Sequence, residues 1–489
     1  MAPPFAFDHR IEFSPQNSDE LLRTIPAAPG VFSLRGEAGE PYLTRTADLR
    51  RRLRRLLAPP EAVDEHGRPI LSKRLNLRER VRFIEYTRTG SEFESTLVLY
   101  CASRSAFGPD EARRRLRLHP PYVLRMTLSH PHPRVYSTNR LSRKSLPESF
   151  GPFPSRAAAE RFCDAVLDLF LLRRCYEDLE PYPDHPGCVY GEMKKCMEPC
   201  KEGNPQACTP EQYAHESLRV FAFFMTRGQS LLDEVATQRE AASEAMDFEA
   251  AASLHKQWEK VRAAALLSDE LVRPIAHLRA ILLQQAAPRE HEARSEEAAV
   301  FLLEHGQIVG PERLSTLGVR AVREQTAVGS SLFAQPLMLA PVPLDEASAP
   351  PTSDPPSVST LTPEDRARTA IEALTSRAEA PAEIAELCDS LSLFRRWYYR
   401  PEKQRAGEVF LPNPDGTWPI RRILNGAARV VLGPPTPAQA VEREAAREAA
   451  KALKTKIIHP GREGVEREVP VLPRRSRTRK AVTPTDLSE

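Results

Sequence analysis

Four cysteines near the middle of the chain have a spacing that suits metal binding. Their pattern is C-x12-C-x7-C-x3-C, formed by Cys175, Cys188, Cys196 and Cys200. Thiolates that converge from a short segment can bind Zn²⁺ or an iron–sulfur cluster. Because the segment between them has few apolar residues, a metal would supply its local core. The spacing alone does not choose between zinc and iron, and four separate free thiols are the alternative.

Two further cysteines could serve as metal ligands, and the N-terminal sequence indicates where in the cell the protein is located. Cys163 and Cys208 lie close enough in sequence to replace one of the four ligands. The chain begins without a charged segment followed by an apolar run, and it has no apolar stretch long enough to span a membrane. We therefore expect a cytoplasmic protein with free or metal-bound thiols and no disulfide framework.

Arginines are clustered, although the net charge of the 489 residues is only +3. The three blocks are Arg50, Arg51, Arg52, Arg54 and Arg55; Arg113, Arg114, Arg115 and Arg117; and Arg474, Arg475, Arg477, Arg479 and Lys480. Such clusters suit polyanion binding, because phosphate contacts release counterions. The alternative is that they are solvated helix faces and an open tail.

The elements that would position these residues can be predicted from periodicity and capping. Strands are predicted at 30–34, 41–44 and 82–87, with a helix at 49–57 behind Asp48 and another behind Ser91. Further along, strand-like sequence at 121–136 precedes a helix behind Ser155 and two helices over 210–267. A hairpin at 298–303 and 308–314 follows, and Thr362-Pro363 opens a new helical region.

We therefore predict a multidomain α+β protein. Its expected parts are an N-terminal extension (1–24), an α+β domain (25–108), connecting strands (109–150), a helix with the four-cysteine cluster (151–209), a helical hairpin (210–270), a small β-containing segment (271–345), a Pro/Ser-rich linker (346–361), a helical or mixed C-terminal region (362–465) and a basic disordered tail (466–489).

The segments 151–155, 172–175 and 194–200 resemble the middle of the UvrC family of excinucleases. In that family the four cysteines hold a [4Fe-4S] cluster, so the resemblance favours iron–sulfur over zinc. Residues 246–254 look like the family's UVR motif, a helical hairpin that binds the excinuclease B-type helicase. The resemblance makes Phe248, Glu249 and Leu254 the partner-binding residues; the alternative is a hairpin with no partner.

The N-terminal unit resembles the family's GIY-YIG nuclease domain. That chemistry needs a tyrosine acting on water, positive charge near the phosphate and a carboxylate that holds a divalent metal. The first family tyrosine falls on Phe32 and the second on Tyr42. The motif's glycine falls on Thr44, and the following lysine falls on Arg45. The family's helical arginine falls on Arg52.

The metal-binding glutamate of the family falls on Leu99, and its neighbours Val98 and Tyr100 cannot bind Mg²⁺ either. Only Glu92 or Glu94 could replace it, and Mg²⁺ is expected only if the site is active. The resemblance therefore implies a degenerate nuclease site that keeps its attraction for phosphate. The arginines expected to bind DNA are Arg45, Arg50, Arg51 and Arg54.

After Thr362 we find no acidic strand pattern of the kind that the family's RNase H-like domain needs, and no helix-hairpin-helix repeats. An aromatic-basic helix at 394–400 resembles the end of short family members; it can stack on bases or pack into a core. We predict a DNA-binding, excision-repair-related protein with an impaired nuclease site. The alternatives are an active single-cut endonuclease and an adaptor that acts through the hairpin without DNA.

Overall fold

The computed structural model describes residues 5–59, 75–176, 179–289, 292, 295–319, 361–381, 383–401, 404–432, 456–460 and 466–470. The chain is a mixed α+β protein, as predicted, and it divides into two compact units, residues 1–431 and 432–489. In the second unit, β13 (Lys456–Pro460) pairs with β14 (Glu466–Pro470), so the first residues of the predicted disordered tail form a strand. The rest of that tail, and the predicted linker except residue 361, lie outside the described residues.

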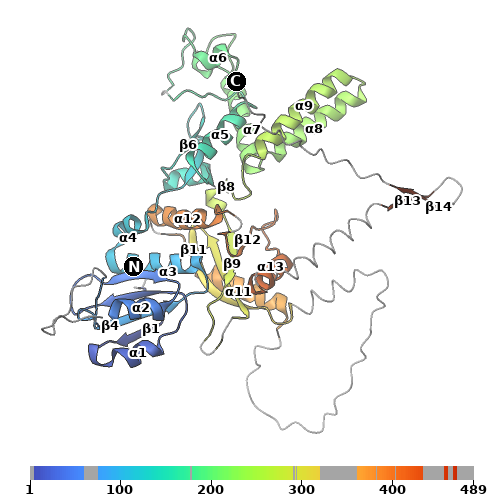
Figure 1. The fold of residues 1–489 in the computed structure, drawn as a ribbon. Helices are drawn as coiled ribbons and strands as arrows, with labels where there is room; N and C mark the ends of the chain where they lie inside the picture. The colour runs from blue at the N-terminus through green and yellow to red at the C-terminus, as the bar shows by residue number, and fades with distance from the viewer. Residues whose placement is uncertain are drawn as a thin grey trace, which may run out of the picture. The chain divides into compact units, whose positions relative to one another are not determined.

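An antiparallel sheet with the order β1-β4-β2-β3 forms the N-terminal part of the first unit (Figure 1). Its strands are β1 (His9–Glu12), β2 (Gly30–Arg35), β3 (Tyr42–Thr46) and β4 (Phe83–Arg88). The predicted extension at 1–24 is therefore not separate, because β1 adds an edge strand to this sheet through β4. The helical elements here are η1 (Pro15–Asn17), α1 (Ser18–Thr24), α2 (Leu49–Leu57), α3 (Glu92–Phe107) and α4 (Pro109–Leu116).

Helix α2 carries its arginines on one face and its leucines on the other. Asp48 caps the helix by accepting a hydrogen bond from the Arg51 backbone N–H at 2.9 Å. The buried leucines share a core with residues of the sheet and α1; they are Leu49, Leu53, Leu56 and Leu57. Burying this face sends the charged face outward.

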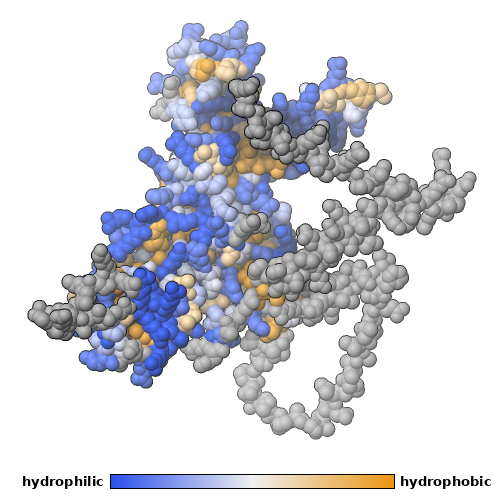
Figure 2. Space-filling model, in the orientation of Figure 1, coloured by the Kyte–Doolittle hydropathy of each residue, from blue (hydrophilic) through white to orange (hydrophobic). Residues whose placement is uncertain are grey.

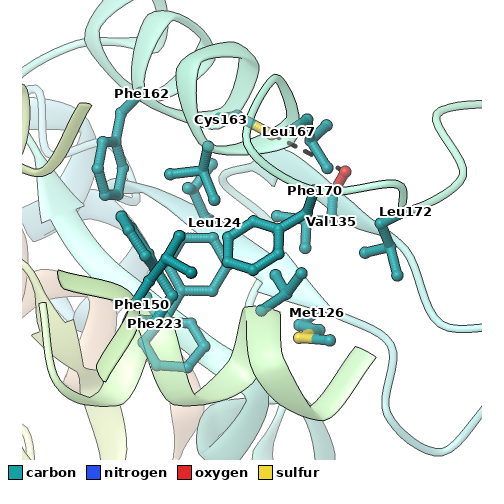
Figure 3. Close-up of a cluster of buried hydrophobic side chains, with 14 of the residues drawn as sticks. Leu124, Met126, Val135, Phe150, Phe162, Cys163, Leu167, Phe170, Leu172 and Phe223 are labelled. Carbon is teal, nitrogen blue, oxygen red and sulfur yellow. Dashed lines mark hydrogen bonds between the residues drawn. The ribbon is translucent and has the colours of Figure 1, made fainter. Parts of the chain in front are cut away.

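A second sheet, with the order β6-β5-β7-β8, forms the middle part. Its elements are β5 (Tyr122–Met126), β6 (Val135–Thr138), η2 (Arg143–Glu148), β7 (Ser149–Phe153), α5 (Arg156–Leu167) and β8 (Arg273–Pro274). Ser155 caps α5, as predicted. Side chains from the sheet, α5 and the following helices form one apolar core around Phe150, Phe162 and Phe223 (Figure 3).

The cysteine segment and a helical region follow α5. The segment contains α6 (Val189–Glu192) and η3 (Pro199–Lys201). Beyond it, the sequence predicted two helices, but the chain forms three: α7 (Pro210–Met225), α8 (Gln229–Glu244) and α9 (Phe248–Ala265). The missed break is a turn at Thr226–Gly228, where Arg227 and Gly228 both take positive φ and Gly228 is the N-cap of α8.

A third sheet, with the order β11-β10-β9-β12, has apolar cores on both faces. Along β9, Ala280 and Leu282 belong to one core, whereas Ile281 and Leu283 belong to the other. Helix α12 contributes to the first core, and α11 and α13 contribute to the second. The elements are η4 (Ile275–His277), β9 (Ala280–Gln285), β10 (Glu297–Glu304), β11 (Gln307–Ser315), α11 (Pro363–Arg377), α12 (Ile384–Tyr398), β12 (Glu408–Phe410) and α13 (Ile420–Leu432).

The predicted hairpin at 298–314 is confirmed as β10 and β11. The other two strands of this sheet, β9 and β12, were not predicted from the sequence. No helix in the described part of the chain is long and apolar enough to cross a membrane.

Candidate functional site

The cysteine segment is anchored at both ends to the middle sheet and its core. Before the first cysteine, Phe170 and Leu172 are buried in that core (Figure 3). Arg173 donates from Nε to the His132 carbonyl at 2.9 Å. After the last cysteine, Thr209 and Gln212 form a capping box that starts α7. The ends of the segment are therefore fixed, while its interior has little regular structure.

Neighbouring thiols contribute to the shifted pKa values of two cysteines in this segment, Cys196 and Cys200. Burial raises the pKa of Cys196 to about 12, and the nearby thiols of Cys188, Cys175 and Cys200 add to the shift. Burial also raises the pKa of Cys200, with Cys188 and Cys175 again contributing. Each of these two thiols therefore lies near others of the four predicted ligands. Within the described part of the chain, no three or more His, Cys, Asp or Glu side chains are arranged to hold a metal ion.

Two N–H groups point at cysteine sulfurs. The Glu198 backbone N–H donates to Cys196 Sγ at 3.3 Å, and Arg173 Nη1 donates to Cys175 Sγ at 3.6 Å. Donors of this kind stabilise thiolate ligands and tune iron–sulfur clusters. A set of four thiols with N–H donors therefore fits an iron–sulfur cluster in its chemistry, and it fits zinc as well.

The two cysteines considered as replacement ligands, Cys163 and Cys208, differ in their surroundings. Cys163 lies in the apolar core, where its thiol donates weakly to the Val135 carbonyl at 3.9 Å (Figure 3). Burial raises its pKa to about 12, and none of the four clustered cysteines contributes to that shift. Cys208 lies near Cys200, which adds to its raised pKa after burial. Of the two, only Cys208 is placed to replace a ligand.

The strands of the N-terminal sheet bring Phe32, Tyr42 and Arg52 together. Phe32 is fully buried, and its ring centroid lies 6.2 Å from that of Tyr42. Arg52 Nη2 donates to the Tyr42 hydroxyl at 3.1 Å. Thr44 stands opposite Phe32 in the β2–β3 register. This arrangement places one hydroxyl and one guanidinium beside a buried phenyl ring.

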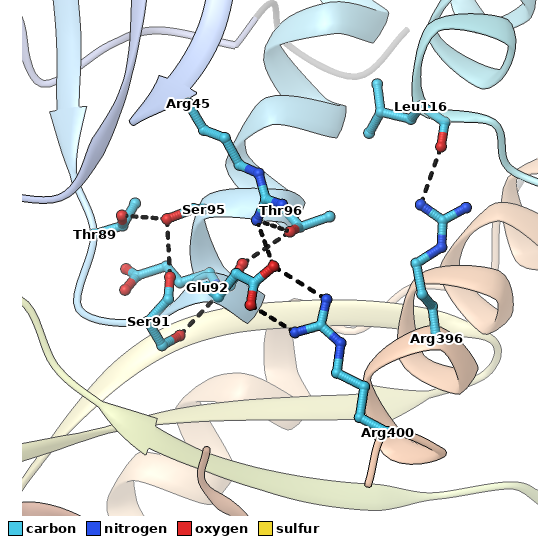
Figure 4. Close-up of polar contacts among 10 residues, drawn as sticks. Arg45, Thr89, Ser91, Glu92, Ser95, Thr96, Leu116, Arg396 and Arg400 are labelled. Atoms are coloured by element: carbon cyan, nitrogen blue, oxygen red, sulfur yellow. Dashed lines mark hydrogen bonds and ion pairs between the residues drawn. The ribbon is translucent and has the colours of Figure 1, made fainter. Parts of the chain in front are cut away.

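Helix α3 carries Leu99, the residue predicted to stand at the position of a metal-binding glutamate. Leu99 is half-buried and lies two helical turns after Glu92, on the same face of α3. Glu92 accepts from Arg45 Nη1 at 3.0 Å, while Arg400 donates to both of its oxygens (Figure 4). The pKa of Glu92 is lowered chiefly by Arg400.

The second carboxylate at the start of α3 is buried. Glu94 is only 6% exposed, and its Oε2 accepts from the Gly90 backbone N–H at 2.7 Å. Burial raises its pKa to about 7. Glu94 faces a cavity of about 460 Å³ that Leu97, Val98 and residues of the third sheet also line. Glu92 is thus held by two arginines, whereas burial disfavours the ionised form of Glu94.

The arginines predicted to bind DNA differ in their surroundings. Arg45 is engaged by Glu92 and Thr96. Arg50 is half-buried, and its Nε donates to the Ile25 carbonyl at 2.6 Å. The exposed guanidinium groups on α2 that have no ion-pair partner in the described part of the chain belong to Arg51, Arg54 and Arg55.

The α8–α9 hairpin places apolar side chains at its tip. Asp247 caps α9 by accepting from the Ala250 N–H at 3.0 Å, which fixes the predicted break. Met246 is 77% exposed and Phe248 is 70% exposed on either side of it. Figure 2 shows this tip as an apolar patch at the end of the two helices. Glu249 is exposed beside them.

Leu254, the third predicted partner-binding residue, lies elsewhere on the hairpin. It is half-buried and packs against the core of the middle sheet, as does Trp258. Leu254 therefore supports the hairpin from the inside, and only Phe248 and Glu249 of the predicted set face solvent.

Contacts between α3, α4 and α12 were not visible in the sequence. Asp389 is 4% exposed and accepts from the Tyr100 hydroxyl and from Arg113 Nε, each at 2.8 Å. Arg104 pairs with Glu386 one turn away. The aromatic residues of α12 are inside, since Phe394 and Trp397 are 0% and 4% exposed. Of the two predicted roles for this helix, packing is the one observed.

Residues 122–223, from β5 through the four cysteines to α7, match the family model described as the UvrC/Cho excinuclease middle domain. This part of the chain is therefore similar to the middle domain of the UvrC family. UvrABC system protein C of Idiomarina loihiensis is 28% identical over 242 residues, which cover 49% of the chain and 37% of that protein. The protein of the same description from Symbiobacterium thermophilum is 27% identical over 301 residues, covering 61% and 44%.

The UvrC-family match from Hyphomonas neptunium is 29% identical over 247 residues, covering 50% of the chain and 37% of that relative. The chain thus spans less than half the length of these curated relatives. No solved structure matches the chain significantly.

Proposed function

We propose that this chain is a DNA-binding protein of nucleotide excision repair whose nuclease-like N-terminal domain does not cut DNA. The feature that carries the proposal is Leu99 on α3, which falls where the resemblance to the family's nuclease domain leads us to expect the metal-binding carboxylate. Mg²⁺ requires oxygen ligands, and carboxylates supply them in nuclease sites. An isobutyl side chain offers none.

The neighbouring carboxylates do not compensate for Leu99. Glu92 already accepts from Arg45 and Arg400, so binding a metal would require both ion pairs to break. Glu94 is buried with a raised pKa, and it would have to ionise in a desolvated position. Phe32 adds a second loss, because it has no hydroxyl to act on the attacking water.

DNA attraction is retained on α2. Arg51, Arg54 and Arg55 stand exposed on the face opposite the buried leucines. Phosphate contacts from such groups release counterions and dominate the affinity for nucleic acid. Arg45 and Arg50 would join them only by giving up their present contacts.

We propose that the four cysteines hold a [4Fe-4S] cluster, with zinc as the alternative. The supporting features are the thiols near Cys196 and Cys200 and the N–H donors from Glu198 and Arg173 to two of the sulfurs. When bound, such a cluster would stabilise a segment that has little apolar content of its own.

We further propose that the tip of the α8–α9 hairpin binds an excinuclease B-type helicase. Phe248 supports this role, because a phenyl ring that is 70% exposed at a helix start has no function in the chain's own core. Glu249 beside it supplies charge at the rim of the patch.

Two assays on the full chain separate the candidate functions. The first measures Mg²⁺-dependent nicking of damaged duplex DNA, and we expect none. Robust nicking that is lost in Tyr42→Phe would establish the alternative of an active single-cut endonuclease.

The second assay measures DNA affinity across a salt titration. The double variant Arg51→Ala/Arg54→Ala should reduce the slope of log affinity against log salt by about 2, since each phosphate contact contributes about 1. Arg82→Ala is the matched control, because its guanidinium pairs with Glu37. Absence of DNA binding at every salt concentration would leave the adaptor as the remaining alternative.

A further inference from the structure

A stack of one arginine and two tyrosines lies where the first cysteine meets the middle sheet. The guanidinium carbon of Arg134 is 5.1 Å from the ring centroid of Tyr136 and 5.0 Å from that of Tyr176. Both distances are within the range of cation–π attraction. Tyr136 is half-buried on β6, the edge strand of the sheet, whereas Tyr176 is 73% exposed.

The position of Arg134 in this stack is fixed by the cysteine segment. Arg134 Nη1 donates to the Cys175 carbonyl at 2.9 Å. No carboxylate pairs with Arg134 among the described residues, so its charge is not neutralised within that part of the chain. A carbonyl orients the guanidinium without cancelling its charge, and the flat group can support a ring on each side.

Further positive charge lies beside the stack. Arg125 stands directly opposite Tyr136 in the β5–β6 register and has no ion-pair partner in the described part of the chain. Arg156, at the start of α5, is already paired with Glu160 at 2.7 Å and adds little net charge. The stack therefore combines an open aromatic face with the charges of Arg134 and Arg125.

We propose that Tyr176, supported by Arg134 and Tyr136, is a stacking platform for an unpaired base of DNA. The outer face of an exposed tyrosine attracts any base, because every base has a π face, and surrounding arginines suit the phosphates on either side. A paired base is stacked within its duplex and does not offer that face. The platform rests on the proposed DNA-binding function and deepens it, because it names unpaired bases as the chemistry recognised.

The alternative occupant of an exposed tyrosine is an apolar protein surface. The stack fits nucleic acid better, because its central group is a cation with no acidic partner among the described residues, and burying that cation against an apolar surface would be costly. Phosphate beside the stack would instead offset the charge.

The test compares two DNA molecules of equal length, one fully paired and one with a short central bubble of unpaired thymines. Affinities of the full chain are measured for both at one salt concentration. Tyr176→Ala should weaken binding to the bubble about tenfold, the loss expected for one stacked base, and leave the paired duplex unchanged. Tyr176→Phe keeps the ring and should bind the bubble like the unmodified chain.

Tyr182→Ala is the matched control, since Tyr182 is also exposed in the cysteine segment but contacts the His185 ring instead of an arginine. It should bind both DNA molecules normally. If Tyr176→Ala binds the bubble as well as the unmodified chain does, or loses affinity for both molecules equally, the platform is refuted while DNA binding stands. If the unmodified chain binds neither molecule, the proposed function itself fails.

Discussion

The buried carboxyl group of Glu94 should make the stability of the first unit depend on pH. Its pKa is raised from an ordinary 4.5 to about 7, chiefly by burial, and the Gly90 N–H offsets this only in part. Between those two pH values the folded chain keeps a proton that the unfolded chain releases. The free energy of unfolding must therefore fall as pH rises through this window.

The magnitude follows from the size of the shift. Each pKa unit corresponds to about 1.4 kcal/mol, so the contribution lost by pH 8 is about 3 kcal/mol. Glu94→Gln keeps an oxygen that can accept from Gly90 and cannot ionise. It should match the unmodified chain near pH 5 and be the more stable of the two at pH 8.

Denaturant unfolding measured at several pH values tests this expectation. Trp397 reports on the region, because its ring centroid lies 5.6 Å from that of Phe93 on α3. Changing the other two tryptophans, Trp258 and Trp418, to phenylalanine isolates its fluorescence. At each pH, the free energy of unfolding of the unmodified chain is subtracted from that of the variant. This difference removes the contribution of all other titrating groups.

Glu92→Gln is the matched control with the opposite sign. The pKa of Glu92 is lowered chiefly by Arg400, so its contribution is present above the unfolded pKa and is lost as pH falls. This variant should be less stable at neutral pH and should retain the loss of stability between pH 4.5 and 7. The reasoning about Glu94 is refuted if Glu94→Gln shows the same pH slope as the unmodified chain.

Three further variants test the other contacts. Cys196→Ala should abolish the visible absorption of a [4Fe-4S] cluster and the iron content of about four atoms per chain. The control variant Cys208→Ala should keep both the absorption and the iron. Stoichiometric zinc without visible absorption would contradict the iron assignment. Phe248→Ala should weaken binding of a B-type helicase by at least about 2 kcal/mol in calorimetry, with Leu266→Ala, also exposed but at the other end of α9, as the control. Asp389→Ala should lower the free energy of unfolding by about 2 kcal/mol, because the buried Tyr100 hydroxyl and the partly buried Arg113 Nε lose their acceptor. An unchanged denaturation midpoint would show that these donors find other partners.

Much of the local structure was predictable from the sequence, because its signals act over a few residues. Asp48, Ser155 and Thr362 each cap the helix that was expected to start there, since a side-chain oxygen needs only the backbone N–H groups of the next turn. The break at Asp247 is of the same kind. That Leu99 stands at a metal-binding position stays a prediction from the resemblance.

The third helix of the region 210–267 shows where prediction from local sequence fails. Two apolar helical stretches flank the polar residues Thr226–Gly228, and they were predicted as one helix although α7 ends and α8 begins there. The turn is decided by the backbone of Arg227 and Gly228, both at positive φ, and by the packing of α8 against α9.

Only the tertiary structure decided which side chains contact one another in the candidate sites. Whether Glu92 is an available metal ligand depends on Arg400, which is 308 residues away in sequence, and the partners of Asp389 are 289 and 276 residues away. The stack on Arg134 likewise joins β6 to a tyrosine that follows the first cysteine. Contacts over such separations leave no periodic or spacing signal, because they arise when separate elements bury their apolar faces together and so bring their charged groups within reach.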